Sequence, residues 1–272
     1  MPAPPPESDP AIVRAIFMTL ARSLETLIRQ LHQRRGREKR ALALAEGVRL
    51  VEEAVAAKVS IHTALLAPGL ETTPRGVALA ERLRAVAGTT ATVTDGELAK
   101  LSATDQPQGV LAVIEPPVWR MEDLPTDRSL LVLDGVQDPG NVGTMLRTAW
   151  ALGAGGVVAL PGTAEFTNPK VLRASMGGFF RMPCPAATVQ ELAGWSDRHS
   201  IPLWITAMDG EPLTGRPPGP VALAVGNEGA GISPGLAGLA RRRVAIPLRR
   251  DAESLNVAVA AGILLYEVLR ER

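Results

Sequence analysis

Two short, almost purely apolar runs near the C-terminus constrain the fold of this chain more than any other feature of its sequence. Residues 221–225 lead into a glycine-rich loop at residues 226–231, and residues 244–248 lead into a charged turn followed by Ser254-Leu255-Asn256. Apolar runs of about four to eight residues bounded by turn signals predict buried strands. Loops that follow parallel strands meet at one edge of the sheet and form a pocket there. We therefore expect the C-terminal part of the chain to build a binding pocket.

Helices and strands are predicted to alternate on both sides of a polar, proline-containing stretch, residues 116–128, which is typical of a linker. In front of it, residues 36–115 predict a small α/β unit. Its strands are expected at residues 61–66, 91–93 and 110–114 and its helices at residues 47–57, 74–87 and 95–101. Residues 1–35 are expected to be a disordered, proline-rich tail followed by a helix, over residues 11–31, that runs into a basic segment and breaks at Gly36.

Residues 129–272 predict an open α/β sheet of parallel strands. Its first strand is a near-continuous apolar run, which is typical of a strand covered on both faces. The strands are expected at residues 129–133, 157–160, 186–188, 202–207, 221–225 and 244–248, with helices at residues 144–152, 168–177, 189–199 and 255–270. The chain of 272 residues is long enough for these two domains.

The composition excludes several classes of protein. No apolar run reaches the roughly 18–20 residues that a membrane helix needs. Cys184 is the only cysteine, and His32, His62 and His199 are far apart in the sequence, so neither a disulfide nor a metal cluster is expected. A cytoplasmic protein without a structural metal is the expectation.

Positive charge is clustered, although the net charge is only +1. Residues 29–40 hold six cations and one acid, and residues 241–250 hold five arginines and no acid. Such clusters are typical of phosphate-binding surfaces, and they are equally compatible with a solvated charged face. The candidate RNA-binding side chains are Arg34, Arg35, Arg37, Lys39 and Arg40.

Three polar motifs follow predicted strands, and each has an ordinary structural explanation when taken alone. The pattern N-x-G-x-x-x-R at residues 141–147 is compatible with a helix cap and a surface arginine. The loop at residues 226–231 is compatible with a turn that needs glycine for its backbone, with Glu228 facing solvent. Ser254 and Asn256 are compatible with caps of the last helix. No G-x-G-x-x-G follows a strand, so a dinucleotide fingerprint is missing.

Taken together, the order and spacing of these motifs resemble the three motifs of the SpoU/TrmH family of RNA ribose 2′-O-methyltransferases. The resemblance extends over nearly the whole chain apart from its N-terminal tail. It also rests on KVLRASMG at residues 170–177, on the basic segment at residues 27–40, on LAEG at residues 44–47 and on PQGV at residues 107–110. The last three look like the small substrate-binding domain that often precedes the catalytic one.

The resemblance implies a trefoil-knotted α/β methyltransferase domain, S-adenosylmethionine as cofactor, RNA as substrate and a homodimer. The small N-terminal domain resembles ribosomal-protein-like RNA-binding modules. The cofactor site is implied to lie at Leu223, Gly226, Asn227, Ile246, Leu255 and Asn256. The catalytic set is implied to be Arg147, Asn141, Glu228, Ser254 and Asn256.

The resemblance assigns the deprotonation of the ribose hydroxyl to the motif arginine, here Arg147, and the chemistry of the reaction favours a different role for it. A ribose 2′-hydroxyl must be held in line with the methyl group, so positioning supplies much of the acceleration. The guanidinium has a pKa above about 12 and is a poor base at neutral pH. We therefore expect Arg147 to hold the adjacent phosphate and to stabilise the developing alkoxide, with a base role in a strongly perturbed environment as the alternative.

Three other functions compete with methylation of 23S ribosomal RNA. Methylation of tRNA shares the chemistry, but the separate N-terminal domain favours ribosomal RNA. A non-catalytic RNA-binding or assembly factor shares the fold, but all of the motif residues are present. A dinucleotide-dependent oxidoreductase lacks its glycine fingerprint.

Overall fold

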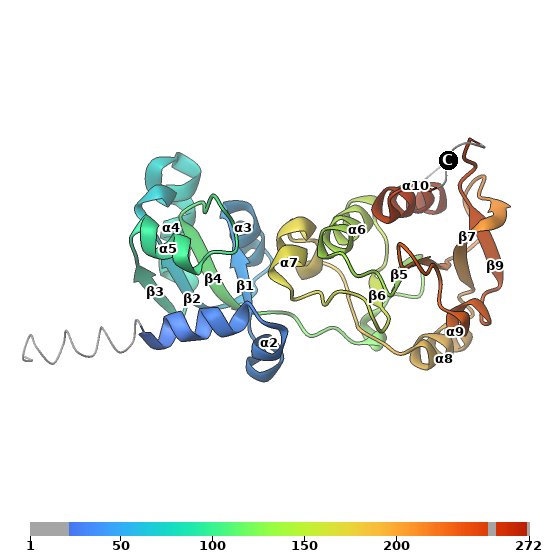
Figure 1. The fold of residues 1–272 in the computed structure, drawn as a ribbon, viewed down its shortest axis with the longest axis horizontal. Coiled ribbons are helices and arrows are strands. Elements are labelled where there is room, and N and C mark those ends of the chain that lie inside the picture. The colour runs from blue at the N-terminus through green and yellow to red at the C-terminus, as the bar shows by residue number, and fades with distance from the viewer. Residues whose placement is uncertain (1–21, 250–253, 271–272) are drawn as a thin grey trace, which may run out of the picture.

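The computed structural model describes residues 22–249 and 254–270, in two units joined by an extended segment (Figure 1). The proline-rich tail, the first half of the helix predicted over residues 11–31 and the last arginine of the second basic cluster, Arg250, lie outside the described residues. The α/β class and the parallel sheet expected from the sequence are confirmed. The threading of the last loops through one another, implied by the resemblance, stays a prediction.

The first unit is a four-stranded sheet in the order β1-β4-β2-β3. Strands β1 and β2 run antiparallel to β4, and β3 runs parallel to β2. Its strands are β1 (Ala43–Glu46), β2 (Ser60–Leu66), β3 (Thr89–Thr92) and β4 (Val110–Glu115). Its helices are α3 (Val48–Ala56), α4 (Pro74–Val86), α5 (Asp95–Leu101) and the 3₁₀ turn Pro68–Thr72.

The helix over residues 22–31 belongs to this first unit. Ile28 and Leu31 are fully buried in one cluster with Leu65 of β2 and Leu98 of α5. Alternate strand residues pack on the other face, against α3 and α4, because side chains of a strand point to opposite faces of its sheet. The unit therefore begins before residue 36.

Gly36 lies inside a helix and does not end one. The helix over residues 22–31 ends two residues before α2 (Arg34–Arg40), which contains Gly36. A Cβ atom at Gly36 would lie 2.0 Å from the carbonyl oxygen of Gln30. The expected break at Gly36 is wrong because the glycine is needed where α2 crosses the end of the preceding helix.

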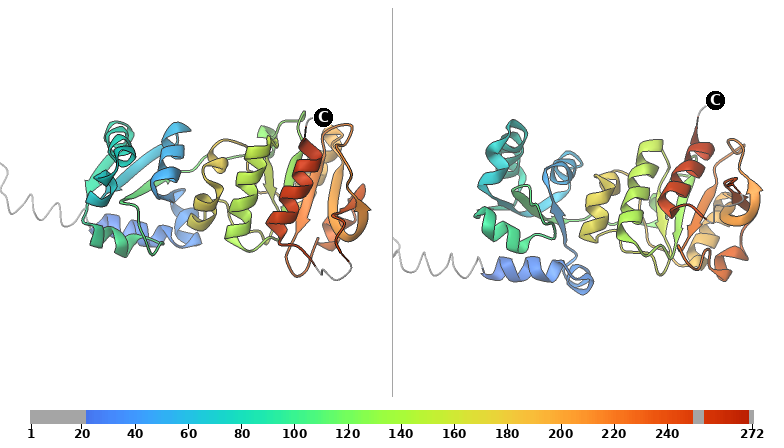
Figure 2. Two further views of the ribbon diagram at one scale, coloured as in Figure 1. Left: turned by 90° about the horizontal axis from the view of Figure 1, so that it is seen from above. Right: turned by 45° about the horizontal axis from the view of Figure 1, so that its top comes forward.

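The second unit is a five-stranded, fully parallel sheet in the order β6-β5-β8-β7-β9. Helices α6, α7 and α10 cover one face, with α8 and α9 on the other (Figure 2). Its strands are β5 (Leu130–Asp134), β6 (Val157–Ala159), β7 (Leu203–Pro212), β8 (Ala222–Gly226) and β9 (Arg242–Ala245). Its helices are α6 (Pro139–Leu152), α7 (Pro169–Ser175), α8 (Val189–His199), α9 (Pro234–Ala237) and α10 (Val257–Leu269), with 3₁₀ turns at Met121–Asp123 and Gly178–Phe180.

Several elements of the second unit differ from the sequence prediction. Helix α6 begins at Pro139, five residues before the expected start, because Asp138 caps it and proline suits the first helical turn. Strand β9 ends at Ala245, so the apolar Ile246 lies in the loop after it. The weak strand expected at residues 186–188 is a single bridge between Ala159 and Ala186. The short helix α9 was not predicted.

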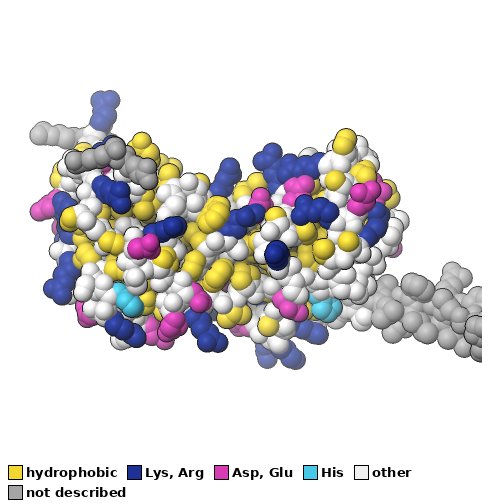
Figure 3. Space-filling model, turned by 180° about the vertical axis from the view of Figure 1, so that it is seen from behind, with side chains coloured by type: hydrophobic (Ala, Val, Ile, Leu, Met, Phe, Trp, Pro, Cys, Tyr) yellow, Lys and Arg dark blue, Asp and Glu magenta, His cyan; other side chains and the backbone are white. Residues whose placement is uncertain are grey.

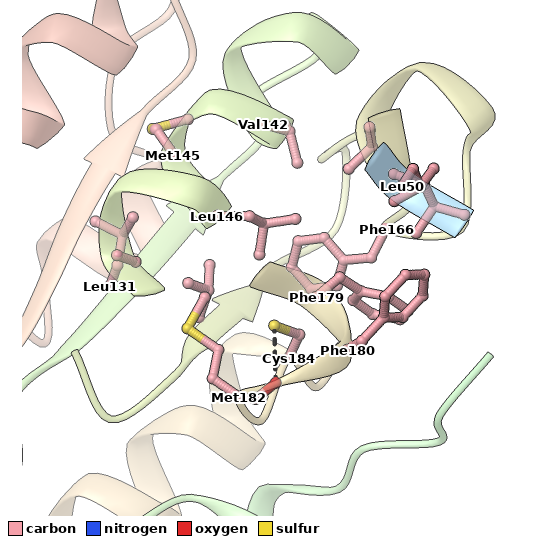
Figure 4. Packing of buried hydrophobic residues seen from close by; sticks show 14 of the residues in the cluster. Leu50, Leu131, Val142, Met145, Leu146, Phe166, Phe179, Phe180, Met182 and Cys184 are labelled. Carbon is pink, nitrogen blue, oxygen red and sulfur yellow. Dashed lines mark hydrogen bonds between the residues drawn. The ribbon is translucent and has the colours of Figure 1, made fainter. Parts of the chain in front are cut away.

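A continuous core joins the two units. Leu50 of α3 packs in the same buried cluster as Phe166 and Phe179, which belong to the second unit (Figure 4). Arg37 of α2 is only 4% exposed, and its Nε donates a hydrogen bond to Glu165 of the second unit. The polar bridge and the shared core hold the two units in one orientation.

Within the described ranges, no helix is long and apolar enough to cross a membrane. The same residues contain no cluster of three or more His, Cys, Asp or Glu side chains that would hold a metal ion.

Candidate active site

Strand β5 delivers the first motif to the carboxyl edge of the sheet. The chain leaves β5 at Asp134, and the carboxylate of Asp138 accepts a 2.7 Å hydrogen bond from the backbone N–H of Asn141. This cap starts α6, so Asn141 lies in the first turn of the helix and not in the preceding loop. The Asn141 side chain is thereby fixed at the edge where β8 also ends.

Side chains from the three motifs form one hydrogen-bonded chain at this edge. Asn256 Nδ2 donates to Asn141 Oδ1 at 3.1 Å, and Asn141 Nδ2 donates to Glu228 Oε1 at 2.9 Å. Asn256 also caps α10, because its Oδ1 accepts from the backbone N–H of Ala258 at 2.9 Å. The helix-cap explanation of Asn256 is therefore correct, and the same residue joins the polar chain as well.

The loop after β8 folds back on itself around Asn227. The Asn227 Oδ1 accepts hydrogen bonds from the backbone N–H groups of Gly229 and Ala230, both at 2.9 Å, and its Nδ2 donates to the carbonyl oxygen of Gly135 at 2.9 Å. A Cβ atom at Gly226 would lie 2.3 Å from the carbonyl carbon of Gly231, so the turn needs glycine there. Asn227 thus links the loops that follow β5 and β8.

A cavity of about 600 Å³ lies between these loops and the start of α10. The size falls within the usual range for small-molecule sites, roughly 300–1,000 Å³. Of the predicted site residues, the cavity is lined by Gly226, Asn227, Glu228, Ile246, Ser254, Leu255 and Asn256. Leu223 does not line it, because this residue lies in the middle of β8 and is fully buried.

Thr206 and Met208 also line the cavity, and the sequence prediction missed both. They come from the middle of the long strand β7, beside the carboxyl end of β8. The strand predicted over residues 202–207 ends beside them, so the rule that the carboxyl ends of parallel strands form the pocket would have found them if it had been applied to every strand.

Arg147 stands apart from the polar chain. It is exposed on α6 and makes no hydrogen bond or ion pair with any residue that the structure describes. It is six residues further along α6 than Asn141, which corresponds to about 9 Å along the helix axis. Its guanidinium is therefore free to bind an incoming anion.

The basic helix α2 has one buried cationic side chain, and its other cationic side chains are exposed. Arg37 is buried, with its Nη1 donating to the carbonyl oxygens of Leu31 at 2.8 Å and His32 at 2.9 Å, so its predicted RNA contact is wrong. The other candidates are all exposed, namely Arg34, Arg35, Lys39 and Arg40. Arg34 pairs with Glu38 at 2.7 Å, and this hydrogen bond raises the pKa of its guanidinium.

Two sequence motifs of the first unit serve its internal structure. The buried carboxylate of Glu46 accepts hydrogen bonds from the Thr104 hydroxyl at 2.7 Å and from the backbone N–H of Ala103 at 3.1 Å. The Oε1 of Gln108 accepts from the backbone N–H of Val48, at the start of α3, at 2.9 Å. Both motifs hold loops against the sheet.

Burial raises the pKa of the Cys184 thiol, so this residue is no candidate nucleophile.

Comparison with known proteins matches both units. A model of the SpoU rRNA methylase family covers residues 128–266, and a model of the MRM3-like substrate-binding domain covers residues 26–112. The 23S rRNA (guanosine(2553)-2′-O)-methyltransferase RlmP of Bacillus subtilis is 35% identical over 248 residues, which are 88% of this chain and 93% of that protein.

Solved structures agree with this match. The AdoMet-bound rRNA methyltransferase of Sinorhizobium meliloti superposes with a TM-score of 0.80 at 30% identity, over 90% of this chain and 93% of that one. The SpoU methyltransferase AviRb of Streptomyces viridochromogenes, in complex with AdoMet, has a TM-score of 0.81 at 29% identity, over 91% and 96% of the two chains. The chain therefore belongs to the SpoU rRNA methylase family, with an MRM3-like substrate-binding domain in front of its methylase domain.

Proposed function

We propose that this protein transfers the methyl group of S-adenosylmethionine to a ribose 2′-hydroxyl of 23S ribosomal RNA. The observation that carries the proposal is the hydrogen-bonded chain Asn256–Asn141–Glu228 at the mouth of a cavity of about 600 Å³. It joins all three motifs at one edge of the sheet. The Bacillus subtilis relative, named for 2′-O-methylation of a guanosine of 23S rRNA, supports this choice of substrate.

The cavity fits S-adenosylmethionine by size and by the character of its walls. The apolar residues Ile246 and Leu255 and the polar turn of Gly226 and Asn227 all line the cavity. These residues would hold the adenosyl and amino-acid parts of the cofactor. When bound, S-adenosylmethionine supplies a methyl group on a positively charged sulfur, so its leaving group is already activated.

The residues of the chain would then position the ribose and stabilise the negative charge that develops on its 2′-oxygen. Arg147 would pair with the phosphate beside the target ribose and stabilise negative charge on the 2′-oxygen as its proton leaves. Asn141, held from both sides, would orient the ribose by amide hydrogen bonds. Glu228 and Asn256 would keep Asn141 in place, and Ser254 would close the cavity at the start of α10.

A homodimer is proposed from the outer face of α10. Val259, Ile263 and Tyr266 follow one another at helical spacing and are 52%, 40% and 54% exposed. Trp150 of the neighbouring helix α6 is 44% exposed, and α6 and α10 lie side by side in Figure 2. Contiguous exposed apolar side chains of this kind are typical of protein interfaces. A second copy covering them would bring its own surface close to Arg147.

The first unit is proposed to bind the RNA, through the exposed side chains of α2. Arg35, Lys39 and Arg40 present positive charge to solvent on this helix, with Arg34 beside them. Residues 36–115 would form the main body of this RNA-binding domain and residues 129–272 the methyltransferase domain. We place the protein in the cytoplasm, where bacterial ribosomal RNA is found.

The test uses purified full-length protein, labelled S-adenosylmethionine, and unmodified 23S ribosomal RNA or tRNA made by transcription. The RNA is digested to nucleosides and analysed by mass spectrometry. A 2′-O-methylated nucleoside from 23S RNA is expected. The same product from tRNA alone would keep the chemistry and overturn the substrate. If the protein binds S-adenosylmethionine but no label appears in either RNA, the proposal is contradicted for these RNAs.

A further inference from the structure

A second cavity, of about 570 Å³, lies at the junction of the two units. Both units and the linker contribute to it. Arg34 comes from α2, Val118 from the linker, Thr163 and Phe166 from the segment after β6, and Glu191 from α8. The space-filling view in Figure 3 shows hydrophobic side chains exposed across the middle of the molecule, with charged side chains among them.

This junction cavity is connected directly to the proposed catalytic edge. The Thr163 hydroxyl accepts a 3.1 Å hydrogen bond from the backbone N–H of Gly135, and the N–H of Ala164 donates to the carbonyl oxygen of Val136 at 2.9 Å. Gly135 and Val136 belong to the loop that leads into Asn141. Hydrogen bonds therefore connect a segment that lines the junction cavity to the loop that carries the first motif.

The strand order sets the distance between the two cavities. Strand β6 ends at the junction cavity and β8 ends at the cofactor cavity, with β5 and its motif between them. Neighbouring strands are about 4.8 Å apart, so the ends of β6 and β8 are separated by roughly 10 Å. A short stretch of unpaired RNA spans this distance.

Contacts within the chain hold the walls of the junction cavity in place. Arg37, nine-tenths buried, links the end of the first helix to Glu165, which itself lines the cavity. The Trp119 Nε1 of the linker donates to the carbonyl oxygen of Phe179 at 3.1 Å. A preformed cavity loses little freedom when a ligand enters.

The chemistry of the junction cavity suits a nucleobase. Apolar residues line it, including Phe166 and Phe179, and Thr167 and Glu191 supply polar groups beside them. An unpaired base has the same division, with apolar faces and a hydrogen-bonding edge, and proteins recognise RNA mainly through such unstacked bases. The exposed Arg34 of α2 lines the cavity and matches the charge of the attached phosphates.

We propose that the junction cavity binds an unpaired base of the RNA substrate, a few nucleotides from the ribose presented at the cofactor cavity. The proposal rests on the function proposed above. It makes Val118, which is 82% exposed at the rim, a side chain that contacts RNA. It also assigns the selection of the target sequence to the junction between the units, at a distance from the reacting atoms.

The first experiment compares Val118→Asp with the control Val77→Asp, on the outer side of α4, in the full-length protein. The added carboxylate at residue 118 meets the RNA chain and should raise the KM for 23S RNA roughly tenfold, with kcat and S-adenosylmethionine binding unchanged. Val77→Asp should behave as the unsubstituted protein. An unchanged KM in Val118→Asp overturns the proposal.

A photochemical experiment tests the wild-type protein, so it does not depend on the folding of a variant. Transcribed 23S RNA containing 4-thiouridine is irradiated with the protein, and the crosslinked peptides are identified by mass spectrometry. Crosslinks within residues 116–119 or 160–167 are expected. RNA that crosslinks only elsewhere overturns the junction site. Crosslinks at the junction without any methyl transfer would instead keep the binding site and reject the proposed function.

Discussion

Asn256 donates a 3.1 Å hydrogen bond to Asn141, although 115 residues separate the two in the sequence. The contact joins the cap of the last helix to the first turn of α6. Asn141 also donates to Glu228. The oxygen and the nitrogen of its amide therefore each have a partner within the protein. This double constraint is what one expects of a group that must orient a substrate before reaction.

Replacing Asn141 should therefore affect turnover and leave cofactor binding almost unchanged. Asn141→Ala is expected to lower kcat roughly hundredfold, the loss typical of a misplaced reacting group. The Kd for S-adenosylmethionine should stay near its original value, since Asn141 does not line the cofactor cavity. Single-turnover kinetics and calorimetry measure the two quantities. Gln190→Ala, which removes an exposed amide from α8, is the control and should be neutral in both.

Arg147 should be required for transfer and dispensable for folding. Its exposed side chain has no partner in the described part of the chain, so Arg147→Ala should unfold like the unsubstituted protein. Loss of a charge that stabilises the alkoxide is expected to lower kcat at least roughly hundredfold. Arg82→Ala, at an exposed arginine of α4, serves as the control. Near-normal turnover in Arg147→Ala would remove this residue from the mechanism.

The sequence grouped Asn141, Glu228 and Asn256 because their motifs follow predicted strands in the order of the SpoU/TrmH motifs. Parallel strands deliver their following loops to one edge, and the hydrogen bonds show that these three side chains do lie together. The start of α6 was missed although its signals, Asp138 and Pro139, are present in the sequence. The apolar pattern alone locates the helix, and the first turn begins with proline, glycine and asparagine before its one buried apolar residue, Val142.

The basic segment shows where a pattern of charges is insufficient. Arg34 and Arg37 belong to one run of cations, yet the first is exposed and the second is buried. Both side chains pair with Glu165, which is 128 residues away from Arg37, but only Arg37 is also held by the carbonyl oxygens of Leu31 and His32. Local composition contains no information about such a partner.

Removing Arg37 should destabilise the protein strongly. Arg37→Ala leaves the Glu165 carboxylate, only 17% exposed, without its main partner. Breaking a buried pair in this way typically costs about 3–5 kcal/mol, whereas an exposed pair contributes at most about 1 kcal/mol. The control is Arg84→Ala, whose pair with Glu71 is exposed on both sides, at 51% and 42%. Urea unfolding of both variants measures the difference, and equal midpoints would contradict a structural role for Arg37.

A charge on the outer face of α10 should separate the proposed dimer. Ile263→Asp would bury a carboxylate against the second copy and is expected to weaken dimerisation roughly hundredfold or more. Leu239→Asp changes a similarly exposed apolar residue after α9 and should leave the dimer intact. Sedimentation velocity at micromolar concentration distinguishes the two. A monomeric unsubstituted protein would refute the proposed assembly.

The bridge between Arg37 and Glu165 also limits how relatives of this protein can be recombined. A chimera that takes its first unit from one protein and its second from another inherits each half of the bridge from a different parent. If only one half is present, the junction encloses a single charge, and the graft begins with a stability deficit unrelated to RNA recognition. The two positions therefore have to be transplanted as a pair, together with the contacts of Leu50 and Phe166 around them.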